Sequence, residues 1–68
     1  MEDEISQKLL MILKNADEPL ETKDIERQMP KVTRAKIMYR LNDLRAENKI
    51  RGKRLGAGGK GVWIWWAK

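Results

Sequence analysis

Residues 32–66 read VTRAKIMYRLNDLRAENKIRGKRLGAGGKGVWIWW, in a chain of 68 residues. Near the start of this stretch, three apolar side chains recur at the spacing of one helix face: Ile37, Leu41 and Leu44. Thr33 stands just before them and is a good N-cap, because its hydroxyl can accept a backbone N–H from the first helical turn. The pattern predicts an amphipathic helix over about 34–47.

A glycine-rich segment follows the predicted helix. Residues 56–61 contain four glycines, which can take the positive backbone angles that a hairpin turn needs. The run before this segment begins at Ile50, and the run after it is rich in β-branched and aromatic residues. These runs predict two antiparallel strands, at about 50–55 and 62–66.

The first 31 residues are expected to support this helix and hairpin. An apolar stripe that starts at Ile5 predicts a helix over about 4–15, with acidic residues in its first turn that suit the positive end of the helix dipole. A shorter helix is predicted over about 23–29, with Thr22 as its N-cap and Pro30 beyond its end. Between the two helices, residues 20–21 have room for only a bridge-like strand. A chain of this length forms one domain, so residues 1–68 are treated as a single unit.

The net charge of +5 is divided unevenly along the chain. Residues 1–30 carry four basic and eight acidic side chains, a net charge of −4, whereas residues 31–68 carry eleven basic and two acidic side chains, a net charge of +9. Such a concentration of positive charge in a small domain attracts polyanions and speeds their encounter. A charged surface that only keeps the protein in solution is the alternative that composition alone allows.

The order of these elements carries a resemblance to a known family. A short helix, a tight turn and a second helix with a basic N-terminal half form a helix-turn-helix, whose second helix enters the major groove of DNA. With the hairpin added, the chain resembles the winged helix-turn-helix DNA-binding domains of small bacterial and archaeal transcription regulators. Asn48 stands where that family commonly has glycine, and asparagine also visits the left-handed region. The resemblance implies an α+β fold, with a three-helix core and a C-terminal β-hairpin wing.

The resemblance also implies which residues meet double-stranded DNA. On the helix, Arg34 and Lys36 are the best candidates for base contact, because Arg and Lys pair with the acceptors of guanine. The other helix candidates are Thr33, Tyr39 and Arg40. Position 39 is often arginine in the family, so Tyr39 leaves open whether this position contacts a base, a sugar or a phosphate. Four wing residues are expected to meet phosphates or the neighbouring minor groove: Arg51, Lys53, Arg54 and Lys60.

The orientation of the tryptophan-rich strand stays open at this point. Side chains alternate along a strand, so either Trp63 and Trp65 or their neighbours Ile64 and Trp66 face the helices. An exposed tryptophan pair would mark a contact surface, and we therefore name Trp63 and Trp65 as candidate protein contacts. A protein-interaction module that uses this strand is the alternative function, and an RNA-binding module is another, since single-stranded RNA stacks on aromatic side chains. The resemblance further implies a homodimer, which would have to form through the first helix or the exposed face of the wing.

Other classes of function find little support in the composition. The chain has no cysteine, no histidine and only one serine, so no nucleophile and base can be paired and we do not expect an enzyme. No cofactor, metal site or small-molecule effector is indicated. The glycine-rich segment precedes a strand, whereas a phosphate-binding loop opens a helix. No apolar run of about 18 residues is present and the N-terminus is acidic, so we expect a cytoplasmic protein without a membrane span or signal peptide.

Overall fold

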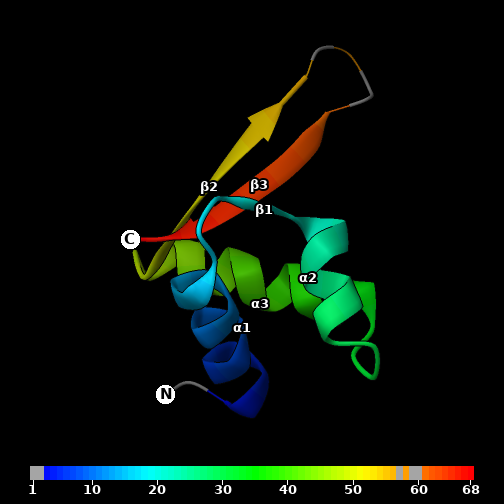
Figure 1. The fold of residues 1–68 in the computed structure, drawn as a ribbon, viewed down its shortest axis with the longest axis vertical. Helices are drawn as coiled ribbons and strands as arrows, with labels where there is room; N and C mark the ends of the chain where they lie inside the picture. Colours follow the sequence, from blue (N-terminus) through cyan, green and yellow to red (C-terminus); the bar gives the residue numbers. More distant parts are fainter. Residues whose placement is uncertain (1–2, 57, 59–60) are drawn as a thin grey trace.

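The computed structural model describes residues 3–56, 58 and 61–68 (Figure 1). Its elements follow one another as α1 (Glu4–Asn15), β1 (Leu20–Glu21), α2 (Thr22–Gln28), α3 (Arg34–Ala46), β2 (Ile50–Leu55) and β3 (Val62–Ala67). The expected α+β class is confirmed, and the arrangement of helices and hairpin is compatible with a winged-helix layout. Among the described residues, no helix combines the length and the apolar character needed to cross a bilayer.

The three strands form one antiparallel sheet in the order β1-β3-β2. β2 and β3 make a long hairpin that projects beyond the helices, as Figure 1 shows. Gly52 pairs with Trp65 across this hairpin, and Lys53 pairs with Ile64. β1 adds only two pairs on the other side of β3, which is enough to tie the start of α2 to the sheet.

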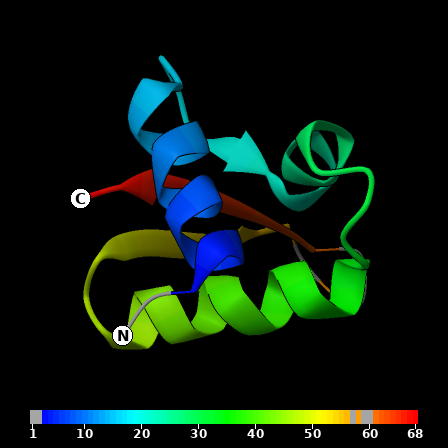
Figure 2. The ribbon, with the colours of Figure 1, turned by 90° about the horizontal axis from the view of Figure 1, so that it is seen from below.

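The helices cover one face of the sheet. In Figure 2, α3 runs along the lower edge of the view, α1 crosses it steeply and α2 stands near its N-terminal end. Nine apolar side chains of the described residues are buried between the helices and the sheet: Leu9, Leu13, Ile25, Met29, Ile37, Leu41, Leu44, Ile50 and Trp65. The three residues that predicted the face of the third helix all belong to this core.

Local hydrogen bonds fix where the helices begin. Asp3 caps α1 by accepting the backbone N–H of Ser6 at 2.9 Å. Thr33 caps α3, as expected, and its hydroxyl accepts the backbone N–H of Lys36 at 3.3 Å. The expected cap of α2 was wrong. Glu21 holds that position in a reciprocal capping box, and Thr22 is the first residue of the helix.

The end of α3 takes the form that the sequence predicts. Asn48 has a φ of 63°, in the left-handed region. The backbone N–H of Lys49 then donates to the carbonyl of Leu44 at 2.9 Å, which satisfies a carbonyl of the last turn. This turn directs the chain from α3 into β2, so that the hairpin lies against the helix that precedes it.

Candidate nucleic-acid interface

The outward side of α3 is a row of uncharged side chains. Ala35, Tyr39, Asn42 and Ala46 follow one another at intervals of three or four residues, which places them along one line of the helix. All four are exposed, and Tyr39 keeps 66% of its surface accessible. The residue types at the centre of the exposed face are therefore suited to hydrogen bonding and apolar contact, and the charges lie beside them.

One flank of this row faces the wing. Arg34, Met38 and Arg45 lie on this side of α3, and the guanidinium carbon of Arg45 is 5.2 Å from the ring centroid of Trp63. Arg34 and Met38 line a hollow of about 200 Å³ together with Trp63. The side chain of Arg34 is 69% exposed and its contact with the carboxylate of Glu26, at 3.9 Å, is long. A single weak ion pair of this kind contributes little, so Arg34 can turn to another anion.

The other flank faces α1 and carries Lys36, Arg40 and Asp43. Lys36 is exposed. Because residues two apart in a helix point in nearly opposite directions, Arg34 and Lys36 stand on opposite sides of the uncharged row. Arg40 pairs with the residue that caps α1. Its Nη2 donates to Asp3 Oδ2 at 2.6 Å, and its Nε is buried without a hydrogen-bond partner among the described residues. Arg40 is only partly exposed and its guanidinium joins α3 to the start of α1, and its assignment to the DNA contact stays a prediction.

Asp3 is consequently both a helix cap and an ion-pair partner. The hydrogen bond from the Ser6 backbone N–H is the main influence that lowers the pKa of the Asp3 carboxyl below its ordinary value of 3.8. The positive charge of Arg40 acts in the same direction, and partial desolvation opposes both. The carboxylate is therefore held in its charged form at neutral pH, where it neutralises the one arginine on this flank.

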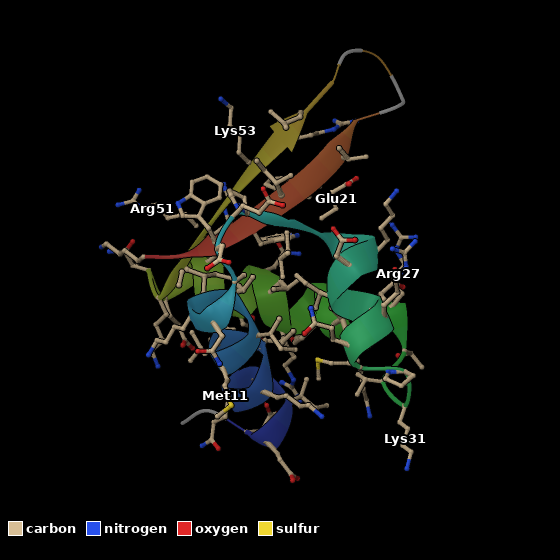
Figure 3. All side chains as sticks on the ribbon, viewed as in Figure 1. Met11, Glu21, Arg27, Lys31, Arg51 and Lys53 are labelled. Carbon is tan, nitrogen blue, oxygen red and sulfur yellow. The ribbon has the colours of Figure 1, made fainter. Side chains whose placement is uncertain are left out.

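The two faces of the wing are chemically different. Alternation along the paired strands puts Arg54 and Trp63 on the inner face, toward the helices, and Arg51 and Lys53 on the outer face. Figure 3 shows Arg51 and Lys53 pointing away from the helices. The side chain of Arg54 lies against Gly61, and its Nη2 donates to the carbonyl of Gly58 at 3.3 Å. Lys60, the fourth basic residue assigned to the wing, lies outside the described residues.

The burial of the tryptophans shows which face of β3 lies toward the helices, a choice that the sequence left open. Trp65 is fully buried, and its ring stacks on that of Trp63 with centroids 5.2 Å apart and an angle of 19° between the planes. Trp65 is therefore not available as a protein contact, and the expectation for that residue is corrected. Trp63 is partly buried between Trp65 and Arg45, and the tryptophan on the outer face is Trp66.

Sequence reasoning missed four residues of these surfaces. Ala35 and Asn42 lie one turn on either side of Tyr39, so helical spacing alone could have identified them. Arg45 was passed over because the sequence gives no sign that the wing folds back over the last turn of α3. Trp66 was assigned no role, because its face could not be chosen without the register of the hairpin.

Carboxylates do not gather into a metal site in the described part of the chain, where no group of three or more potential ligands occurs. The exposed face of α3 instead combines hydrogen-bonding side chains with flanking cations. No known family model matches this chain, and no curated protein sequence is similar enough to it to count as a match.

Proposed function

We propose that this protein binds double-stranded DNA and acts as a small transcription regulator in the cytoplasm, with α3 in the major groove. The observation that carries the proposal is the face of α3, where Tyr39 and Asn42 stand exposed between Arg34 and Lys36 on the two flanks. An α-helix with its side chains is about 10–12 Å wide, which matches a major groove of about 12 Å.

The flanking charges suit the walls of such a groove. A helix that lies in the major groove has a sugar-phosphate backbone on each side of it. Arg34 and Lys36 project toward opposite sides of α3, so each is near one backbone or near the base edges beside it. The net charge of +9 in residues 31–68 supplies the long-range attraction that brings the helix to the polyanion.

The central row supplies groups that read base edges. The amide of Asn42 can pair with adenine through two hydrogen bonds, and Tyr39 offers a hydroxyl and an apolar ring beside a thymine methyl group. Nδ2 of Asn42 donates to the carbonyl of Met38 at 3.0 Å in the free protein, which leaves Oδ1 as an acceptor. Rotation of this exposed side chain exchanges a local bond for one to a base.

Arg54 is the wing residue with the best position for a backbone contact. It is on the inner face, the same side of the hairpin as α3, and its guanidinium reaches the turn. Arg51 and Lys53 project from the outer face, so they add to the positive field but point away from α3. We therefore expect Arg54 to contribute more to DNA affinity than Lys53, although both carry one positive charge.

A salt titration tests the proposal. Fluorescence anisotropy of a labelled random-sequence duplex is measured at about 50 and 200 mM salt, and five phosphate contacts would give a slope of roughly −4.5 for log affinity against log salt. Arg34→Ala should weaken binding and flatten the slope, whereas Lys14→Ala should do neither, because the C-terminal end of α1 lies across the molecule from α3 (Figure 2). Tighter binding by Arg34→Ala would contradict the groove model.

Competition separates DNA from the alternatives. Unlabelled duplex DNA should displace the labelled duplex at lower concentration than single-stranded RNA of equal length does. Stronger competition by the RNA would favour stacking on aromatic side chains over insertion into a major groove. No binding at the lower salt concentration would mean that the basic half is only a solvated surface.

A further inference from the structure

The outer face of the sheet is an apolar strip between two charged edges. The side chains of β2 and β3 that point away from the helices form this face. The apolar strip consists of Leu55, Val62, Ile64 and Trp66, and the basic edge beside it consists of Arg51 and Lys53. Leu55 is 41% exposed and Val62 is 45% exposed, and Ile64 and Trp66 are partly exposed beside them. A contiguous strip of large apolar side chains on a small domain marks a contact surface.

The charges on the two edges of this face have opposite signs. β2 carries Arg51 and Lys53 at one edge. At the other edge, β1 carries Glu21, which pairs with Ile64, and the loop before β1 carries Asp17 and Glu18. Because β3 lies between β1 and β2, one row across the sheet reads acidic, apolar and basic, from Glu21 through Ile64 to Lys53.

A hollow lies at the acidic edge, beside the partly exposed indole of Trp66. Its volume is about 400 Å³, and its lining includes Asp17, Glu18, Pro19 and Trp66. The structure gives Asp17, Glu18 and Arg51 no ion pair with any of the described residues. The hollow therefore joins an aromatic wall to two carboxylates that are open to a cation.

We propose that the outer face of the sheet binds a second copy of this chain, through a two-fold axis parallel to β3. Rotation about such an axis puts β3 over β3 and puts the basic edge of each copy over the acidic edge of the other. Ile64 and Trp66 then meet their own counterparts, as residues near an isologous two-fold axis do. The strands of the two sheets run in nearly the same direction, which is a common geometry for packed sheets.

The charge pattern selects this axis over the other one that would stack the two faces. A two-fold axis across the strands would put β2 over β2, so that the basic edge of one copy, with Arg51 and Lys53, would face the basic edge of the other copy and repel it. With the axis along β3, Arg51 of each copy enters the hollow of the other copy, beside Trp66. There it meets Glu18, and a guanidinium over an indole face adds a cation–π contact. α3 lies on the far side of the sheet and stays uncovered in this dimer.

A charge-exchange experiment tests the arrangement. Sedimentation equilibrium of the full chain, without nucleic acid and at up to about 1 mM protein, gives the dimer dissociation constant. Arg51→Glu and Glu18→Arg should each raise this constant on the order of tenfold or more, because each puts like charges together. The double variant restores opposite charges in every pair, so its constant should return to within about threefold of the wild-type value.

Two control variants, one further test variant and a check of folding accompany the experiment. Lys31→Glu changes the net charge by the same amount as Arg51→Glu but lies far from the sheet (Figure 3), and it should leave the dissociation constant unchanged. Trp66→Ala should weaken the dimer, and circular dichroism should show that each variant keeps its helix content. Met11→Ala removes an exposed apolar side chain of α1 and should have no effect.

The result that would overturn the proposal is equally definite. A chain that stays monomeric at the highest concentration does not use this face to bind itself. A dimer that Met11→Ala weakens and Arg51→Glu leaves intact forms through α1 instead. Failure of the double variant to recover would rule out the axis along β3. Since no nucleic acid is present, none of these outcomes depends on the proposed binding to DNA.

Discussion

The indole Nε1 of Trp65 donates a hydrogen bond of 3.0 Å to the hydroxyl of Thr22, 43 residues away in the sequence. Both side chains are buried. The bond joins the first residue of α2 to the middle of β3, and the stacked ring of Trp63 carries the contact on to Arg45 at the end of α3. The hairpin is thus held to two helices by one chain of polar and aromatic contacts.

Thr22→Val should destabilise the protein by about 1–3 kcal/mol, because the isosteric methyl group leaves the buried indole N–H without an acceptor. Urea denaturation followed by far-ultraviolet circular dichroism measures the change. Thr22→Ser is the matched control, since it retains the hydroxyl and should lose less stability than the valine variant. A valine variant as stable as the wild type would show that the hydrogen bond does not contribute to stability.

Gly52→Ala should also destabilise the fold, by about 1–3 kcal/mol. A Cβ at position 52 would stand 2.6 Å from two ring atoms of Trp65, closer than any real contact of that kind. The indole would have to move, so its near-ultraviolet circular dichroism should change along with the unfolding midpoint. Lys53→Ala, one residue along on the exposed face, should stay within about 0.5 kcal/mol of the wild type. An unchanged indole signal in Gly52→Ala would mean that the backbone moves and the ring does not.

These contacts also show what the sequence could and could not predict. The face of α3 followed from Ile37, Leu41 and Leu44, because helical spacing is a local property. The face of β3 did not, since both registers of the hairpin satisfied the alternation of side chains. The choice depends on the space that Gly52 leaves for Trp65 and on the acceptor that Thr22 provides, neither of which can be read from the strand itself.

Arg40 illustrates the same limit in the candidate interface. Its sequence neighbours suggested an exposed cation on the groove-facing helix, but its partner is Asp3, which is 37 residues earlier, near the N-terminus. Tyr39, by contrast, was expected to be exposed and is exposed, because it lies opposite the buried face of its own helix. Positions fixed by the period of one helix were predictable, and positions fixed by a distant charge were not.

Asp3→Asn should lower stability at neutral pH and have a diminishing effect in acid. The fold depresses the pKa of the Asp3 carboxyl, so its charge stabilises the native state above the ordinary value of 3.8, and this contribution is lost as the pH falls through the folded value. Asparagine still caps the helix, which isolates the effect of the charge. Urea denaturation from pH 7 to pH 2 should therefore show two stability curves that converge at low pH. A gap of the same size at every pH would mean that the charge of the Asp3 carboxylate does not contribute to stability.

Asn42→Ala should reduce discrimination between DNA sequences, once a preferred site has been selected from a random library. Loss of a bidentate contact to adenine removes about 1–3 kcal/mol of preference for one base pair. Alanine favours an exposed helix more than asparagine does, so weaker binding cannot be explained by a melted α3. Arg54→Ala is the comparison variant, because loss of a phosphate contact should weaken binding to all sequences alike and reduce the salt slope by about 0.9. Affinities measured for the selected site and for each of its single base-pair changes distinguish the loss of a base contact from the loss of a phosphate contact. If Asn42→Ala weakens every site equally, its amide does not read a base, and the sequence preference must come from another residue of α3 or from the wing.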